Sequence, residues 1–173
     1  MSDIFQQVTD GQDFIKRILA KIPGFKGYIE RGDRRMSDKL LREKIANEFS
    51  TLHQRVSSLQ RDLVNQGELG AVGQLEQAEI KLRTFIDRIR TASYGYAGLF
   101  DAIKIREDEL AQVYQYDYAL LELSDSVKSS IDNVETSIGT EGLDAAIRHL
   151  VNTSQQCIDA FNKRTEVMKG IAD

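Results

Sequence analysis

The stretch that decides the fold is SDKLLREKIANEFSTLHQRVSSLQRDL, residues 37–63. Large apolar residues return along it at steps of three and four positions, which places one apolar stripe along a helix. Ser37 is a favourable N-cap, and Asp38 in the first turn would complement the positive end of the helix. The pattern predicts a long helix with a heptad-like seam made of Leu41, Ile45, Phe49 (or Glu48), Leu52, Val56, Leu59 and Leu63.

Three further helices follow from the same spacing in the rest of the chain. They cover residues 71–92, 106–138 and 141–171, and each carries an apolar seam. Residues 139–142 are short enough to force the last two helices to run antiparallel. We therefore expect an all-α fold, an antiparallel four-helix bundle with long, coiled-coil-like helices, over residues 36–173.

An N-terminal segment precedes this body. Residues 4–22 have the pattern of an amphipathic helix, and Pro23 disfavours helical geometry in the residue before it. Residues 23–32 should then be an ordered connector whose aromatic and aliphatic side chains pack on another part of the protein. We assign residues 1–35 to a first unit, an amphipathic helix with a basic connector.

Composition limits where such a protein works. Its single cysteine, Cys157, cannot form an internal disulfide, which suits a reducing compartment. No apolar run approaches the ~18–20 residues of a membrane-spanning helix, and the N-terminus has no signal-peptide pattern. We expect a cytoplasmic protein, with the inner face of the membrane as the alternative for a peripheral protein.

Charge is distributed unevenly along the chain. Residues 14–46 hold ten Lys and Arg against four acids, a net charge of +6, and the whole chain has −4, so the remainder carries −10. A basic segment beside an acidic body either folds back on that body or binds an external anionic partner. The residues that would make an anionic contact are Lys16, Arg17, Lys21, Lys26, Arg31, Arg34 and Arg35.

Polar residues interrupt two of the apolar seams. Asp117 and Ser124 occupy seam positions in the third helix and Ser154 in the fourth, so we expect a buried polar layer. A seam carboxylate must be paired, protonated or at an opening. It either serves a ligand pocket or catalytic acid with the tyrosines around it, or fixes helix register through an ion pair. The candidate ion-pair partners are Arg34, Arg35, Arg88 and Arg90.

The sequence lacks the residue patterns of metal, cofactor and nucleophilic sites. A di-iron bundle needs Glu three residues before His, but Ser50 precedes His53 and Ala146 precedes His149 at that spacing. Phosphate-binding and dinucleotide-binding glycine loops are missing as well. We therefore predict no metal site, no cofactor and no catalytic residue, and nucleic acid is not an expected partner.

Three functions remain open on this basis. The first is a non-enzymatic helical scaffold that self-associates as a homo-oligomer or binds a protein partner. The second is a peripheral protein whose basic amphipathic helix lies on an anionic membrane. The third is a small-ligand binder or enzyme that uses Asp117 and nearby tyrosines. We favour the first, because long seams are what helical assemblies require.

Overall fold

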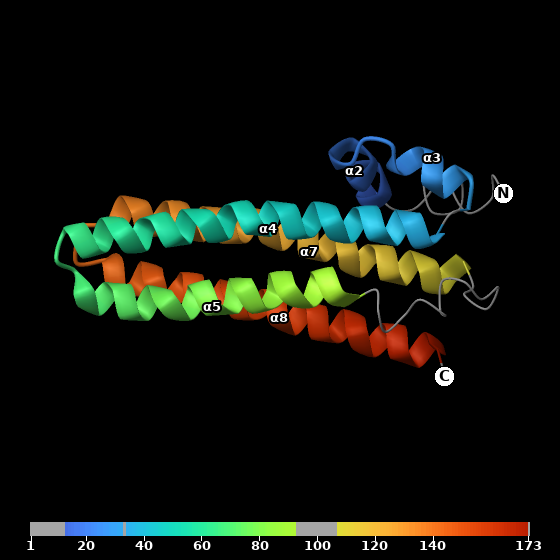
Figure 1. Cartoon of the computed structure of the whole chain (residues 1–173). Helices are drawn as coiled ribbons and strands as arrows, with labels where there is room; N and C mark the ends of the chain where they lie inside the picture. The colour runs from blue at the N-terminus through green and yellow to red at the C-terminus, as the bar shows by residue number, and fades with distance from the viewer. Residues whose placement is uncertain (1–12, 33, 93–106, 173) are drawn as a thin grey trace.

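The computed structural model describes residues 13–32, 34–92 and 107–172, and most of these residues lie in helices (Figure 1). The all-α fold predicted from the sequence is confirmed for this part of the chain. Residues 4–12, the predicted start of the N-terminal helix, lie outside the described residues. The helices are α2 (Asp13–Lys21), α3 (Phe25–Glu30), α4 (Arg34–Asn65), α5 (Leu69–Thr91), α7 (Glu107–Ser137) and α8 (Leu143–Ala172).

Four long helices, α4, α5, α7 and α8, lie side by side, and the short helices α2 and α3 rest against them near one end (Figure 1). Helix α4 packs on α5 and α7, and α8 packs on the same two helices. Helix α2 contacts α7, whereas α3 contacts α4. The turns from α4 to α5 and from α7 to α8 both lie at the opposite end of the molecule (Figure 1).

The turn after α4 is a helix stop that requires glycine. Gly67 has φ +79°, in the left-handed region. Its N–H donates to the carbonyl of Val64 at 3.0 Å, and the N–H of Glu68 donates to the carbonyl of Leu63 at 3.0 Å. These two bonds form a Schellman motif, which satisfies carbonyls that the helix end would otherwise leave unpaired. The chain can therefore reverse within a few residues and begin α5.

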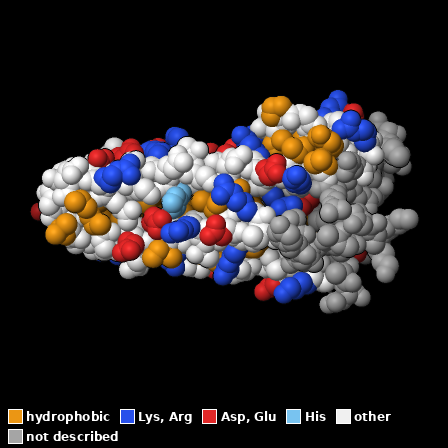
Figure 2. All heavy atoms as spheres, viewed as in Figure 1, with side chains coloured by type: hydrophobic (Ala, Val, Ile, Leu, Met, Phe, Trp, Pro, Cys, Tyr) orange, Lys and Arg blue, Asp and Glu red, His pale blue; other side chains and the backbone are white. Residues whose placement is uncertain are grey.

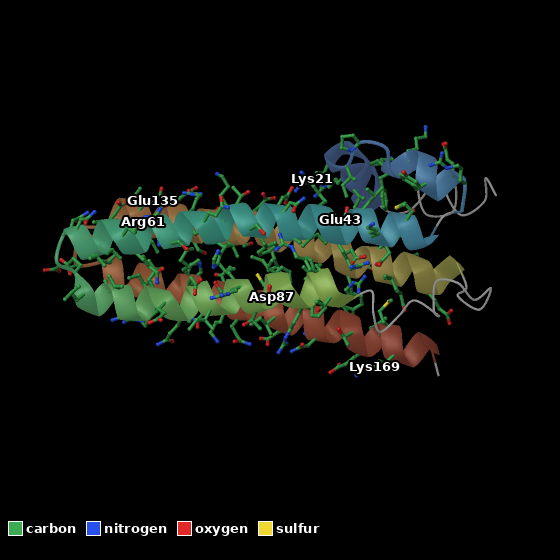
Figure 3. All side chains as sticks on the ribbon, viewed as in Figure 1. Lys21, Glu43, Arg61, Asp87, Glu135 and Lys169 are labelled. Carbon is green, nitrogen blue, oxygen red and sulfur yellow. The ribbon has the colours of Figure 1, made fainter. Side chains whose placement is uncertain are left out.

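The predicted seam of residues 37–63 lies in the core. Every apolar member of that seam, from Leu41 to Leu63, is buried. Phe49 of α4 stacks against Phe85 of α5 with ring centroids 4.5 Å apart, and Phe85 meets Phe161 of α8 edge-on at 6.2 Å. Side chains fill the space between the helices (Figure 3). The core is thus one connected cluster across the long helices.

The predicted N-cap at Ser37 is wrong. Helix α4 begins three residues earlier, at Arg34, and Ser37 and Asp38 are buried on its inner side. The physical reason is that the carboxylate of Asp38 bonds to two arginines in the interior and does not cap the helix. The boundary placed between residues 35 and 36 falls inside the first turns of α4.

The N-terminal unit shares the core of the long helices. Ile18 of α2, Ile22 directly after α2 and Phe25 of α3 are buried in the same hydrophobic cluster. Phe25 meets Tyr114 of α7 edge-on, with ring centroids 5.8 Å apart. The segment predicted as a connector, residues 23–32, therefore contains a short helix that is pinned to α7. A bilayer-spanning helix is not found in the part of the chain that the structure describes.

Candidate functional site

Asp117 belongs to a network of four buried charged side chains. Nε of Arg164, on α8, donates to Oδ1 of Asp117 at 2.5 Å, and Nη2 of Arg164 donates to Oδ2 at 3.4 Å. The same Nη2 also donates to Oδ1 of Asp38 at 2.8 Å. Arg42 completes the network: its Nε donates to Oδ2 of Asp38 at 2.7 Å, and its Nη1 to the carbonyl of Ile89 on α5 at 3.3 Å. The network therefore joins all four long helices.

The network is closed to solvent and electrically balanced. Its side chains are between 0% and 6% exposed, and two carboxylates face two guanidinium groups. Burial raises the pKa of Asp117, while the charge and hydrogen bonds of Arg164 oppose that rise. Burial also disfavours the charge of Arg164, but Asp117 and Asp38 outweigh this and raise the pKa of its guanidinium. In the network each carboxylate lies against a guanidinium group, which offsets part of the cost of burial.

The ion-pair partner of Asp117 is a residue that the sequence analysis missed. Arg88 donates instead to Asn162 at 3.0 Å, and Arg90 donates to Ser50 at 2.9 Å. The other two candidates, Arg34 and Arg35, lie at the start of α4, and their side chains are outside the described residues. A signal for Arg164 existed: it is three residues after Phe161, at the seam position where an apolar residue was expected.

The three residues predicted to form one polar layer are all buried, and their described hydrogen bonds do not join them. The hydroxyl of Ser124 donates to the carbonyl of Leu121 at 2.6 Å and to Glu48 at 3.0 Å. The hydroxyl of Ser154 donates to the carbonyl of Leu150 at 2.8 Å. These bonds are local to α7 and α8 or reach α4, and none includes Asp117. The structure brings Asp117 together with Asp38, Arg42 and Arg164 instead.

The basic N-terminal residues face the protein's own acids. Nη1 of Arg17 donates to the hydroxyl of Tyr118 at 2.8 Å and lies 3.6 Å from Glu122. Nζ of Lys21 lies 3.6 Å from the carboxylate of Asp125, also on α7. These contacts are largely exposed, whereas the apolar face of α2 is buried beneath them. Helix α2 is thus docked on α7 by apolar packing with a polar rim.

Two of the other residues predicted to contact an anion, Lys26 and Arg31, interact with residues close to them in the sequence. Lys26 pairs with Glu30 within α3 at 3.6 Å, and the guanidinium of Arg31 lies over the ring of Tyr28 at 4.7 Å. Lys16 is exposed on α2. Of the seven residues predicted to contact an anion, those whose side chains are described lie on α2, on α3 and in the turn after α3, and the anionic partner remains a prediction.

Two shallow grooves lie along the contact of α4 with α7. One, of about 250 Å³, is lined by Lys21, Glu48 and Asp125 among others. The second, of about 240 Å³, contains Arg55, which bridges Asp132 at 2.6 Å and Glu135 at 2.9 Å. Both grooves have walls of mixed charge. Within the described residues, no three His, Cys, Asp or Glu side chains come together as a metal site.

The buried charges bond to one another and connect the four long helices. The described surface mixes both charge signs, with apolar side chains gathered over α2 and near the α4–α5 turn (Figure 2). Comparison of the chain with protein-family models, with curated proteins and with solved structures finds no significant match.

Proposed function

We propose that this protein is a non-enzymatic helical scaffold that self-associates or binds a protein partner in the cytoplasm. In this proposal the four long helices form an antiparallel four-helix bundle with coiled-coil-like seams. The N-terminal helix is a docked part of the same body. The seams are occupied within the chain, so association takes place through the outer faces of the helices.

The proposal rests on the burial and hydrogen bonding of Asp117. This carboxylate was the residue best suited to a ligand, and both of its oxygens accept hydrogen bonds from Arg164 in the core. Its side chain has 0% exposure, which leaves no room for a substrate beside it. A buried, fully paired charge is best known as a device for helix register and specificity. This supports a structural interior and a function at the surface.

The direct test is the mass of the full chain in solution together with crosslinking. Sedimentation velocity over a hundredfold concentration range should show a species heavier than the monomer, or a pull-down should recover a partner whose crosslinks map to outer faces. Crosslinks that instead joined buried seam residues such as Leu75 of two copies would contradict a chain that closes its own core.

Membrane binding makes a different demand on α2. Ile18 and Ile22 would have to leave the core before they could enter a bilayer. Flotation with anionic and with neutral vesicles separates the two functions: the scaffold proposal expects the full chain to stay unbound to both. Flotation on anionic vesicles that is lost in an Ile18→Asp variant with an intact fold would favour the membrane function.

The ligand-binding alternative is tested at Asp117. An Asp117→Asn variant that remains folded but loses a ligand-dependent shift in melting temperature would support it. The scaffold proposal expects the substitution to lower stability and to leave association through outer faces unchanged in the surviving folded protein.

A further inference from the structure

Helix α5 exposes apolar side chains on the face that points away from the core. Leu69 is 67% exposed and Ile80 is 52% exposed, and both belong to α5. They are eleven residues apart, which is about three helical turns, so they lie on one line along the helix. The buried residues of α5, such as Ala78 and Leu82, lie on the opposite side. This outer stripe is defined as Leu69, Gly73, Glu76, Ile80, Arg83 and Asp87.

The charges of the outer stripe differ from the other charges of α5. Glu79, Lys81, Arg88 and Arg90 all hydrogen-bond to side chains of α4 or α8. By contrast, Glu76 and Arg83 make no hydrogen bond or ion pair with another residue in the part of the chain that the structure describes. The stripe therefore holds exposed apolar groups and opposite charges that no described residue of the same chain pairs.

We propose that a second copy of this chain docks on the outer stripe, with the two α5 helices antiparallel and Ile80 at the twofold axis. This inference rests on the proposed function and names its partner. In such an isologous contact each residue before Ile80 faces residues after Ile80 of the other copy. The contact is self-complementary only if the residues before Ile80 match the residues at the same spacing after it.

The charges meet this requirement. Glu76 is four residues before Ile80 and Arg83 is three residues after it. At a rise of about 1.5 Å per residue, Glu76 of one copy lies within about 1.5 Å, along the axis, of Arg83 of the other. At about 100° per residue, both side chains lie on the same flank of Ile80, about 40° and 60° from it. The twofold axis therefore forms the Glu76–Arg83 pair twice.

The rest of the stripe tolerates close approach. Gly73 has no atom within 4 Å of the position of a Cβ, so it opens onto solvent in the single chain. In the antiparallel pair it faces Asp87 of the second copy, seven residues from Ile80 on each side. On the other flank Gln77 faces Thr84, and both are uncharged. No residue of the stripe directly faces one of like charge, and Asp87 is offset by about 4.5 Å along the axis from Glu76 of the second copy.

One helix pair buries less surface than the roughly 1,200–2,000 Å² of stable complexes, so a weak and concentration-dependent dimer is expected. Sedimentation equilibrium of the full chain measures its Kd. Glu76→Arg and Arg83→Glu should each weaken the dimer by about tenfold, because one reversal makes two repulsive pairs. The double variant should restore Kd to within about threefold, since the reversed charges again pair.

A matched control is available on α8. Lys163 and Glu166 are exposed, three residues apart and without a hydrogen bond or ion pair to another described residue. Lys163→Glu and Glu166→Arg should leave Kd unchanged. Equal weakening by the α8 variants, or a double α5 variant that is as weak as the single ones, would overturn the assignment of charge pairing to the outer stripe.

Engineered disulfides test the direction of the pair. Under mild oxidation the Ile80→Cys variant should crosslink, because the two positions meet at the twofold axis. Leu69→Cys should not, since its two copies lie about 33 Å apart in the antiparallel pair. Crosslinking of both variants would instead indicate parallel helices. The native Cys157 is buried and does not compete.

These outcomes distinguish the inference from the proposed function. An unmodified chain that dimerises while the α5 variants have no effect would disprove the outer-stripe contact and leave self-association standing. A chain that stays monomeric to about 1 mM, the weak limit of specific affinity, would overturn the inference and leave only a different protein as partner.

Discussion

At the scale of single residues, Arg164 is the group on which the core most depends. Its guanidinium is the only described donor to Asp117 and one of two to Asp38. A buried ion pair adds little by its presence, because the cost of removing two charges from water offsets their attraction. Its loss is expensive, since the carboxylate left behind has neither water nor a counter-charge. Arg164 is thus needed mainly as the counter-charge of the buried carboxylates of Asp117 and Asp38.

Replacing Arg164 tests this dependence. Arg164→Met should lower the free energy of unfolding by about 3–5 kcal/mol, because the change leaves the buried carboxylate of Asp117 without its counter-charge. Urea unfolding followed by circular dichroism measures the change. The control is Arg88→Met: Arg88 bonds to Asn162 on the surface and should cost less than about 1 kcal/mol. Similar losses for the two variants would refute a special role for Arg164.

Cys157 is the second residue with a chemical consequence. Burial raises the pKa of its thiol to about 12, and its Sγ donates to the carbonyl of Thr153. Folded protein should therefore react with a thiol reagent at pH 8 only by unfolding, whereas protein in 6 M urea should react at once. The raised pKa also means that the folded state keeps a proton that the unfolded state loses. Stability should thus fall between about pH 9 and pH 12.

That thiol prediction has a clear contrary result. Labelling rates of native protein that follow thiolate formation with a midpoint near pH 8.5, the ordinary value, would place Cys157 at the surface. Rates that track urea-induced unfolding would agree with burial.

At the scale of elements, turns and docking contacts decide how the helices are placed. Gly67 and Gly139 both adopt positive φ in the turns that follow α4 and α7. A side chain at such a position strains the backbone. Helix α2 is placed differently, by the burial of Ile18 and Ile22 with Arg17 and Lys21 at the rim. Exposed pairs of this kind contribute little, so apolar packing holds α2 in position.

Two nearby glycines separate the effects of turn and helix. Gly67→Ala should destabilise the protein by about 1 kcal/mol, because the side chain is strained at φ +79°. Gly70 is inside α5, and a Cβ there would meet no atom within 4 Å. Gly70→Ala should therefore stabilise the protein by about 0.5–1 kcal/mol. Thermal unfolding of both variants checks the opposite signs, and a shared sign would contradict the turn geometry.

At the scale of the whole molecule, periodicity predicted the helices and their buried faces. The seam from Leu41 to Leu63 was recoverable because spacing within one helix depends only on helical geometry. The partner of Asp117 was not, because Arg164 is 47 residues away and their contact depends on the relative register of α7 and α8. The pairing of Asp38 with Arg164 spans 126 residues.

The position of α2 on α7 could not be predicted from the sequence, for a related reason. Net charge shows that a basic segment and an acidic body attract each other, but an external anion would attract the same side chains equally. The structure shows that Arg17 contacts Tyr118 and Lys21 contacts Asp125, so these two side chains face the protein's own body. The outer stripe of α5 could not be recognised from the sequence either, because single exposed apolar residues are common on soluble proteins.

The central claim is that the chain closes its own core and works through its outer faces. The most direct test is sedimentation equilibrium of the full, unmodified chain from about 1 μM to 1 mM, the range of weak specific complexes. We expect a folded monomer of 19.6 kDa at low concentration and reversible formation of a dimer at high concentration. A chain that unfolds on dilution as it dissociates would contradict it, because the seams would then be closed between chains.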